Sequence, residues 1–240
     1  MFTLTFMRRA AGVAAVCVAG TSCLFAADAP GRQRGYYRDP AVHGEMVVFT
    51  SEGDLWTVNV KGGAAQRLTS GAGREAMATI SPDGATVAFS AQYEGPSEVY
   101  TMPIAGGVPQ RRTWDGDARP EGWTPDGRLM VETRRYSTLP DPKLVLLDMR
   151  GGREMVPLAE AAEAAYAPDG HTLFFTRWDK QWSQTKRYKG GWAESIWRFD
   201  GKSEATPLTA DWAGTSHGPM VWDGRVYFLS NRFSVACSES

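Results

Sequence analysis

The chain has 240 residues with 26 basic and 27 acidic side chains, so it lacks the net positive field that would attract nucleic acid. Its 26 glycines, 14 prolines and 9 tryptophans suit many short strands joined by tight turns, and they argue against a helical bundle. Two of the three cysteines lie near the N-terminus, which leaves Cys237 with no partner for an internal disulfide or a cysteine zinc cluster.

The N-terminal segment has the organisation of an export signal. Two arginines precede an uncharged run over residues 10–27, and this run ends in two alanines that suit cleavage by a signal peptidase. We therefore expect a signal peptide over residues 1–27 and a linker over residues 28–38. The mature protein would be exported to the periplasm, with membrane contact only through this signal.

A single sequence pattern then repeats along residues 39–232. Its marker is Pro-Asp-Gly, in which Pro presets a turn, Asp can bond back to the backbone, and Gly adopts the positive φ that reverses the chain. The three full copies lie 43 residues apart and centre on Asp83, Asp126 and Asp169. Degenerate copies stand at His43-Gly44 and Asp223-Gly224. A turn at each copy predicts a strand directly after it.

The expected strands are present in each copy and are rich in β-branched or aromatic residues. The first strand after each turn covers residues 47–50, 86–90, 129–133, 173–176 and 226–229. A second strand follows at residues 55–58, 99–102, 144–147 and 196–199. A short outer strand then closes each unit, and the stretch before the next turn supplies the remaining strand. The outer strand ends at Leu68-Thr69, Arg112-Thr113, Pro157-Leu158 or Leu208-Thr209. The only helix-like patch, residues 158–165, is short and Ala-rich.

Four strands in roughly 40–45 residues is the period of a propeller blade. Helical repeats would need an apolar period of 3.6 residues, which is missing here. We therefore predict an all-β fold, a partial β-propeller over residues 39–232 with about four four-stranded blades and the start of a fifth. Residues 233–240 leave the pattern, and we interpret them as a tail produced by a frameshift or a premature stop.

The repeat resembles those shared by TolB, dipeptidyl-peptidase and tricorn propellers. Two later segments are similar to the first propeller of tricorn proteases in particular: residues 186–191 with Ile196-Trp197, and residues 208–228. The resemblance covers roughly residues 39–232. It implies the N-terminal six-bladed propeller of a serine peptidase, which gates peptides and helps assembly, with the serine nucleophile in domains that follow the propeller.

The chain has no counterpart of that family's catalytic motifs, so we expect no catalytic residue, cofactor-binding residue or metal ligand within it. The implied partners are peptides or the C-terminal peptidase domains, with a homo-oligomer in the intact parent and no nucleic acid. Two alternatives stay open. One is a TolB-like periplasmic propeller that binds proteins without an attached enzyme, and the other is the propeller of a dipeptidyl-peptidase-type hydrolase.

An insertion over residues 178–192 is the strongest candidate for a contact site. Its aromatic and basic side chains suit stacking on, and pairing with, a peptide or an adjacent domain. The competing interpretation is that the rings cap a blade while the charges face solvent. The candidate contact residues are Trp182, Lys186, Arg187, Tyr188, Lys189 and Trp192.

The one adjacent serine and histidine, Ser216 and His217, have Asp211 nearby in sequence. A nucleophile needs a base within hydrogen-bond reach, and neighbouring strand residues point to opposite faces. We therefore predict a turn at this pair and no catalytic role.

The remaining polar candidates have structural interpretations. The three histidines lack the spacing of metal ligands and are predicted to be solvent-exposed turn residues: His43, His171 and His217. The aspartates of the Pro-Asp-Gly turns lie a whole blade apart, so they cannot share a calcium ion.

Overall fold

The computed structural model describes residues 35–177, 190–191 and 193–232. The described residues all belong to one compact unit, which begins at Gly35. These residues form eighteen β-strands and no helix, and hence no helix that is long and apolar enough to cross a membrane.

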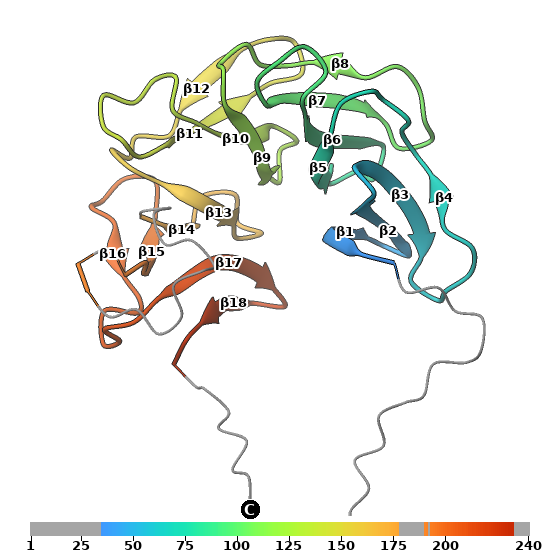
Figure 1. The fold of residues 1–240 in the computed structure, drawn as a ribbon. Helices are drawn as coiled ribbons and strands as arrows, with labels where there is room; N and C mark the ends of the chain where they lie inside the picture. The colour runs from blue at the N-terminus through green and yellow to red at the C-terminus, as the bar shows by residue number, and fades with distance from the viewer. Residues whose placement is uncertain (1–34, 178–189, 192, 233–240) are drawn as a thin grey trace, which may run out of the picture. The chain divides into compact units, whose positions relative to one another are not determined.

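Four antiparallel four-stranded sheets and one two-stranded sheet follow one another along the chain (Figure 1). Sheet 1 contains β1 (Tyr37–His43), β2 (Met46–Ser51), β3 (Asp54–Asn59) and β4 (Gln66–Arg67). Sheet 2 contains β5 (Glu75–Ile80), β6 (Thr86–Ala91), β7 (Glu98–Pro103) and β8 (Gln110–Arg111). Sheet 3 contains β9 (Ala118–Trp123), β10 (Leu129–Thr133), β11 (Lys143–Leu147) and β12 (Arg153–Met155).

Sheets 4 and 5 continue the series. Sheet 4 contains β13 (Ala162–Tyr166), β14 (Leu173–Thr176), β15 (Ile196–Phe199) and β16 (Thr206–Pro207). Sheet 5 contains β17 (Ser216–Trp222) and β18 (Arg225–Ser230). The first strand of each sheet contacts the first strand of the next, and it lies on the inner side while the short fourth strand lies on the outer side (Figure 1). This is an open, partial β-propeller, so the predicted fold is confirmed.

The Pro-Asp-Gly turns form as their chemistry requires. In the first, Asp83 Oδ1 accepts a hydrogen bond from the Ala85 N–H at 3.0 Å, and Gly84 has a φ of 71°. In the third, Asp169 Oδ1 accepts hydrogen bonds from the N–H groups of Thr172 and His171, both at 2.8 Å. These two hydrogen bonds lower the pKa of Asp169 to about 2, and the bond from Thr172 has the larger effect. The prediction that these aspartates are turn residues is confirmed.

A threonine lies two residues after the fourth strand in three sheets, preceded by leucine in sheets 1 and 4 and by Arg112 in sheet 2, and it has a role that the repeat pattern alone does not show. Its hydroxyl accepts a hydrogen bond from a backbone N–H near the start of the third strand. The pairs are Thr69 with Leu55 at 2.9 Å, Thr113 with Val99 at 2.8 Å and Thr209 with Ile196 at 3.0 Å. All three threonines are buried, so the hydroxyl satisfies a donor that water does not reach.

Three buried apolar clusters join neighbouring sheets. Sheets 1 and 2 share Val48, Leu55, Val87 and Phe89. Sheets 2 and 3 share Ala88, Val99, Leu129 and Val131. Sheets 3 and 4 share Met130, Leu144, Phe175 and Phe199. Successive residues of one strand therefore pack against different neighbours, which explains why the second strands are almost continuously apolar.

The helix-like patch at residues 158–165 does not form a helix. Its second half belongs to strand β13, in which Ala162 is fully buried and Ala164 nearly so. Small side chains are needed at these positions because the inner strands pack closely against one another. Burial in the sheet junction therefore overrides the helix propensity of alanine.

Candidate functional site

Each inner strand contains a β-bulge at the same level. In four of them two residues lie opposite one aromatic residue of the second strand, and β9 carries one extra residue. The bulge residues are Asp39 in β1, Met77 in β5, Glu121 in β9, Glu163 in β13 and Gly218 in β17. Asp39, Met77 and Glu163 have φ values of 49°, 55° and 43°, a left-handed conformation that is uncommon for residues other than glycine. Bulges of this kind redirect side chains, and in sheets 1 to 4 the bulge residue has a side chain to redirect.

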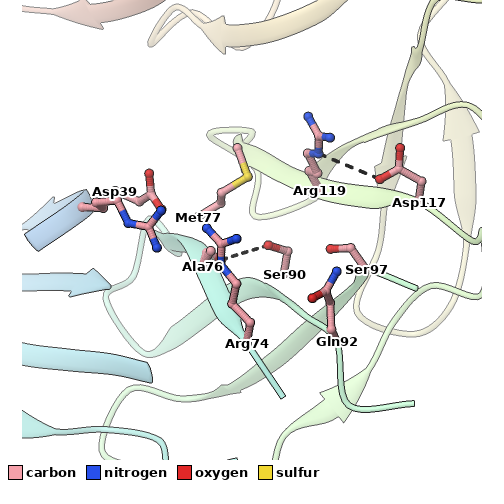
Figure 2. Close-up of a pocket in the computed structure, with 10 residues that line it drawn as sticks. Asp39, Arg74, Ala76, Met77, Ser90, Gln92, Ser97, Asp117 and Arg119 are labelled. Atoms are coloured by element: carbon pink, nitrogen blue, oxygen red, sulfur yellow. Dashed lines mark hydrogen bonds and ion pairs between the residues drawn. The ribbon is translucent and has the colours of Figure 1, made fainter. Parts of the chain in front are cut away.

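A pocket of about 390 Å³ lies at the inner strands of sheets 1, 2 and 3. Figure 2 shows its charged lining, which comes from the strands and from the segments that enter them. Three arginines and two aspartates line it: Arg38, Arg74, Arg119, Asp39 and Asp117. The lining therefore carries one excess positive charge. Met77, Ser90 and Gln92 complete the same wall.

The arginines of this basic pocket differ in how their charge is used. Asp117 accepts a hydrogen bond from Arg134 at 2.9 Å and lies 3.9 Å from Arg119, so two guanidinium groups share one carboxylate. The Arg38 guanidinium lies 5.2 Å from the centre of the Tyr36 ring. Arg74 is exposed and forms no ion pair within the described part of the chain. The pocket thus offers guanidinium groups that carboxylates within the fold do not neutralise.

The junctions of sheets 3 and 4 and of sheets 4 and 5 are acidic where the pocket is basic, because the carboxyl group of a bulge glutamate reaches across each of them. Glu121 Oε2 accepts a hydrogen bond from the Ala164 N–H of sheet 4 at 3.2 Å. Glu163 Oε2 accepts one from the Gly218 N–H of sheet 5 at 2.9 Å and contacts His217 Nδ1 at 3.1 Å. We call these two contacts the carboxylate ties. Each joins the bulge of one sheet to the bulge of the next.

The prediction of a turn at Ser216 and His217 is wrong. Both residues lie in β17, because their backbone pairs with β18, with Ser216 opposite Ser230. Their side chains diverge: Ser216 Oγ lies 3.1 Å from Ser230 Oγ, whereas His217 Nδ1 contacts Glu163. His217 is therefore a partly buried member of a carboxylate tie and is not a solvent-exposed turn residue. Asp211 bonds Arg232 at 2.7 Å, so no Ser-His-Asp arrangement forms.

The other two histidines are solvent-exposed. His43 is exposed at the end of β1, and His171 is exposed in the third Pro-Asp-Gly turn. No group of three or more His, Cys, Asp and Glu side chains is arranged to hold a metal ion within the described ranges. The six candidate contact residues of the insertion lie outside the described residues: Trp182, Lys186, Arg187, Tyr188, Lys189 and Trp192.

The tie between Glu163 and His217 predicts a pH-dependent stability. The hydrogen bond to Glu163 raises the pKa of His217 above its ordinary 6.5. Burial acts to raise the pKa of Glu163, but bonds from His217 and Gly218 outweigh it and leave this pKa below 4.5. The histidine's contribution is complete below pH 6.5 and is lost as the pH rises through its folded pKa; the glutamate's is complete above pH 4.5 and is lost below it. The tie is therefore strongest between these two values.

We expect the chain to have a larger free energy of unfolding at about pH 6 than at about pH 8.5. Both side chains are about one-third exposed, so solvent screening limits the contribution of the tie to about 0.5–1 kcal/mol. Burial and the nearby charge of Glu132 raise the pKa of Glu121, which adds a pH dependence of the same sign. His217→Gln should reduce the difference in the free energy of unfolding between about pH 6 and about pH 8.5, as measured by urea unfolding. The reduction should equal the contribution of the tie between Glu163 and His217, and the contribution of Glu121 should remain. An unchanged difference in that variant would contradict the assignment.

The family model described as the tricorn protease N-terminal β-propeller domain matches residues 34–237. The chain belongs to this family. Tricorn protease homolog 1 of Streptomyces coelicolor is 34% identical over 203 residues, which are 82% of this chain and 19% of that protein. A relative named putative Tricorn-like protease N-terminal subunit, from Sulfurisphaera tokodaii, is 28% identical over 168 residues, 66% of this chain and 83% of that protein.

Solved structures agree with this tricorn-type propeller. The crystal structure of the tricorn protease superposes with a TM-score of 0.73 at 21% identity, over 83% of this chain and 20% of that one. The structure of a putative TolB from Agrobacterium tumefaciens gives a TM-score of 0.63 at 24% identity, over 77% of this chain and 65% of that one. At these identities the likeness shows the shared fold alone. The chain spans about one-fifth of the length of the tricorn protease homolog from Streptomyces.

The sequence interpretation missed the basic pocket of the tricorn-type propeller. Its signal is present in the inner strands, where Arg38 stands directly before a bulge residue in the run Arg-Asp-Pro and Arg119 stands two residues before one in the run Arg-Pro-Glu. Comparing the strands that precede each Pro-Asp-Gly turn would have brought these two arginines together. Arg74 comes from the segment before β5 and has no such marker.

Proposed function

We propose that this chain is the non-catalytic N-terminal propeller of a tricorn-type serine peptidase, and that it guides peptides and assembles with the part that carries the nucleophile. The observation that carries the peptide-guiding role is the basic pocket on the inner strands of a propeller of this family. Peptides carry carboxylates, and unpaired guanidinium groups at an inner wall attract them. The divergent side chains of Ser216 and His217 support a propeller without chemistry of its own.

The assembly role is supported by sheet 5. Met220, Trp222 and Leu229 are each more than half exposed on its two strands, with Trp222 at 70%. Exposed aromatic and aliphatic residues in one small area are typical of protein interfaces. The relative from Sulfurisphaera tokodaii is named a subunit, which supports a non-covalent partnership between such a propeller and a second polypeptide. We also propose, from the N-terminal segment, that the chain works in the periplasm.

The test combines an activity assay with capture of a defined class of partner. The full chain, expressed with an affinity tag in its source organism, should show no turnover of fluorogenic peptides after purification to a single polypeptide. Under gentle conditions it should co-purify with a protein that a fluorophosphonate probe labels, since this reagent marks active-site serines. Trp222→Ser should weaken this capture, and Val108→Ser, which changes an 82% exposed residue in the connection between β7 and β8, should not.

Two outcomes would reject the proposal. Peptide turnover by the pure chain would show that it has chemistry of its own. Reproducible partners that the probe never labels would favour the TolB-like alternative, a propeller that binds proteins without an enzyme. The TolB likeness rests on the fold, so it supplies no site that favours this alternative in advance.

A further inference from the structure

We propose that the basic pocket binds a carboxylate group of a peptide. The pocket lies at the level of the β-bulges, where the junctions of sheets 3 and 4 and of sheets 4 and 5 each contain a glutamate of the chain itself. This inference rests on the proposed peptide-guiding function, from which we take the ligand to be a peptide. It adds which chemical group of the peptide is recognised and which residues recognise it.

The carboxylate ties supply the precedent within the same molecule. At the junction of sheets 3 and 4 the carboxyl group is that of Glu121, and at the junction of sheets 4 and 5 it is that of Glu163. Both accept backbone N–H groups at the bulge of the following sheet. The inner wall of this propeller therefore has places for a carboxyl group at the level of the bulges.

At the junctions of sheets 1 and 2 and of sheets 2 and 3, the bulge residues form no such tie among the described residues. The bulge residue of sheet 2 is Met77, which has no carboxylate and is 39% exposed in the pocket wall. Asp39, the bulge residue of sheet 1, forms no side-chain hydrogen bond or ion pair in the described part of the chain. The pocket occupies this level, and three arginines contribute to its lining.

The arginines are suited to the missing anion. Arg74 has no ion-pair partner among the described residues, and Arg119 shares its aspartate with Arg134, which lies closer to it. A guanidinium group offers paired N–H donors that match the two oxygens of a carboxylate. The volume of about 390 Å³ is within the range of small-molecule sites and accommodates a carboxylate side chain with adjoining backbone. Gln92 and Ser97 add hydrogen-bonding groups to the same wall.

The binding experiment uses the full chain and three fluorescein-labelled peptides of equal length. The first contains one glutamate and an amidated C-terminus, the second replaces that glutamate by glutamine, and the third has the glutamine with a free C-terminal carboxylate. Fluorescence anisotropy should show that at least one carboxylate peptide binds about tenfold more tightly than the neutral second peptide. The first and third peptides distinguish a side-chain carboxylate from a terminal one.

A variant pair tests the location. Met77→Glu supplies an internal carboxylate and should lower the affinity for the carboxylate peptide about tenfold, whereas Met77→Gln should retain it. Glutamate fits the left-handed backbone there, since Glu163 has a φ of 43° and Met77 has 55°. Arg74→Ala should weaken binding, and Arg198→Ala, an exposed arginine on β15, should not. Circular dichroism and thermal melting of each variant establish that it is folded.

Equal affinity for all three peptides, or carboxylate binding by Met77→Glu equal to wild type, would overturn this inference. These results are independent of the capture experiment. If carboxylate selectivity fails while the fluorophosphonate-labelled partner is still captured, the proposed function stands and the ligand assignment falls. If carboxylate selectivity is found but the pure chain cleaves peptides, the ligand assignment stands and the proposed non-catalytic function fails.

Discussion

Phe175→Ala should lower the free energy of unfolding by about 3–5 kcal/mol, the range measured for removal of large buried aromatic side chains. Phe175 is 2% exposed and belongs to the cluster that joins sheets 3 and 4, where it packs with Leu144 and Phe199. The backbone on both sides is held by paired strands, so the cavity cannot close fully. Urea unfolding of the purified chain, followed by tryptophan fluorescence and circular dichroism, gives the change.

Leu208→Ala is the control for this prediction. Leu208 is also a large apolar residue of sheet 4, but it is 46% exposed, so its truncation should change the free energy of unfolding by less than about 1 kcal/mol. If both variants lose less than this amount, the junction between sheets 3 and 4 does not carry the stability that its burial implies.

The second large effect is expected at Glu98, which is 2% exposed in sheet 2. Its carboxylate accepts hydrogen bonds from the N–H groups of Gly116 at 2.8 Å and Asp115 at 3.1 Å, and from Arg111 at 3.1 Å. The Thr113 hydroxyl donates a further one. Glu98→Gln replaces one acceptor oxygen by a donor and leaves Arg111 without its buried counter-charge. We expect a loss of about 2–4 kcal/mol.

Glu94→Gln is the matched control, because Glu94 bonds the same arginine from solvent. It lies 2.6 Å from Arg111, but its side chain is 69% exposed. Exposed ion pairs contribute about 0–1 kcal/mol, so this variant should unfold close to wild type. A Glu98→Gln chain that is as stable as the Glu94→Gln chain would show that burial does not strengthen this network.

The spacing of the Pro-Asp-Gly turns was sufficient to predict the fold because each turn is local chemistry. Asp83 and Gly84 fix the chain reversal within a few residues, and the apolar run after them has to pair with its neighbour. The predicted strands at residues 129–133, 173–176 and 196–199 coincide with β10, β14 and β15. The role of the buried threonine was not predictable, since its partner lies in another strand.

The candidate site could not be predicted in the same way. The bulges depend on the register between strands, which a run of residues does not reveal. The partner of His217, Glu163, lies 54 residues away in sequence, so no local pattern indicates that this histidine belongs to a strand and a carboxylate tie. The arginines of the pocket come from three sheets, and only packing of the inner strands brings them to one wall. The six candidate contact residues of the insertion over residues 178–192 lie outside the described residues.

The outer rim of the propeller is protected against unwanted association. The outermost strands β4, β8, β12 and β16 have only two or three residues, and three of them carry an arginine while the fourth contains proline. Such short, charged or proline-containing edges offer little backbone for another chain to extend. Strand β18 has six residues and one paired neighbour among the described strands. Self-association of concentrated protein should therefore begin at β18, and a lysine in place of Tyr227 would be the first substitution to suppress it.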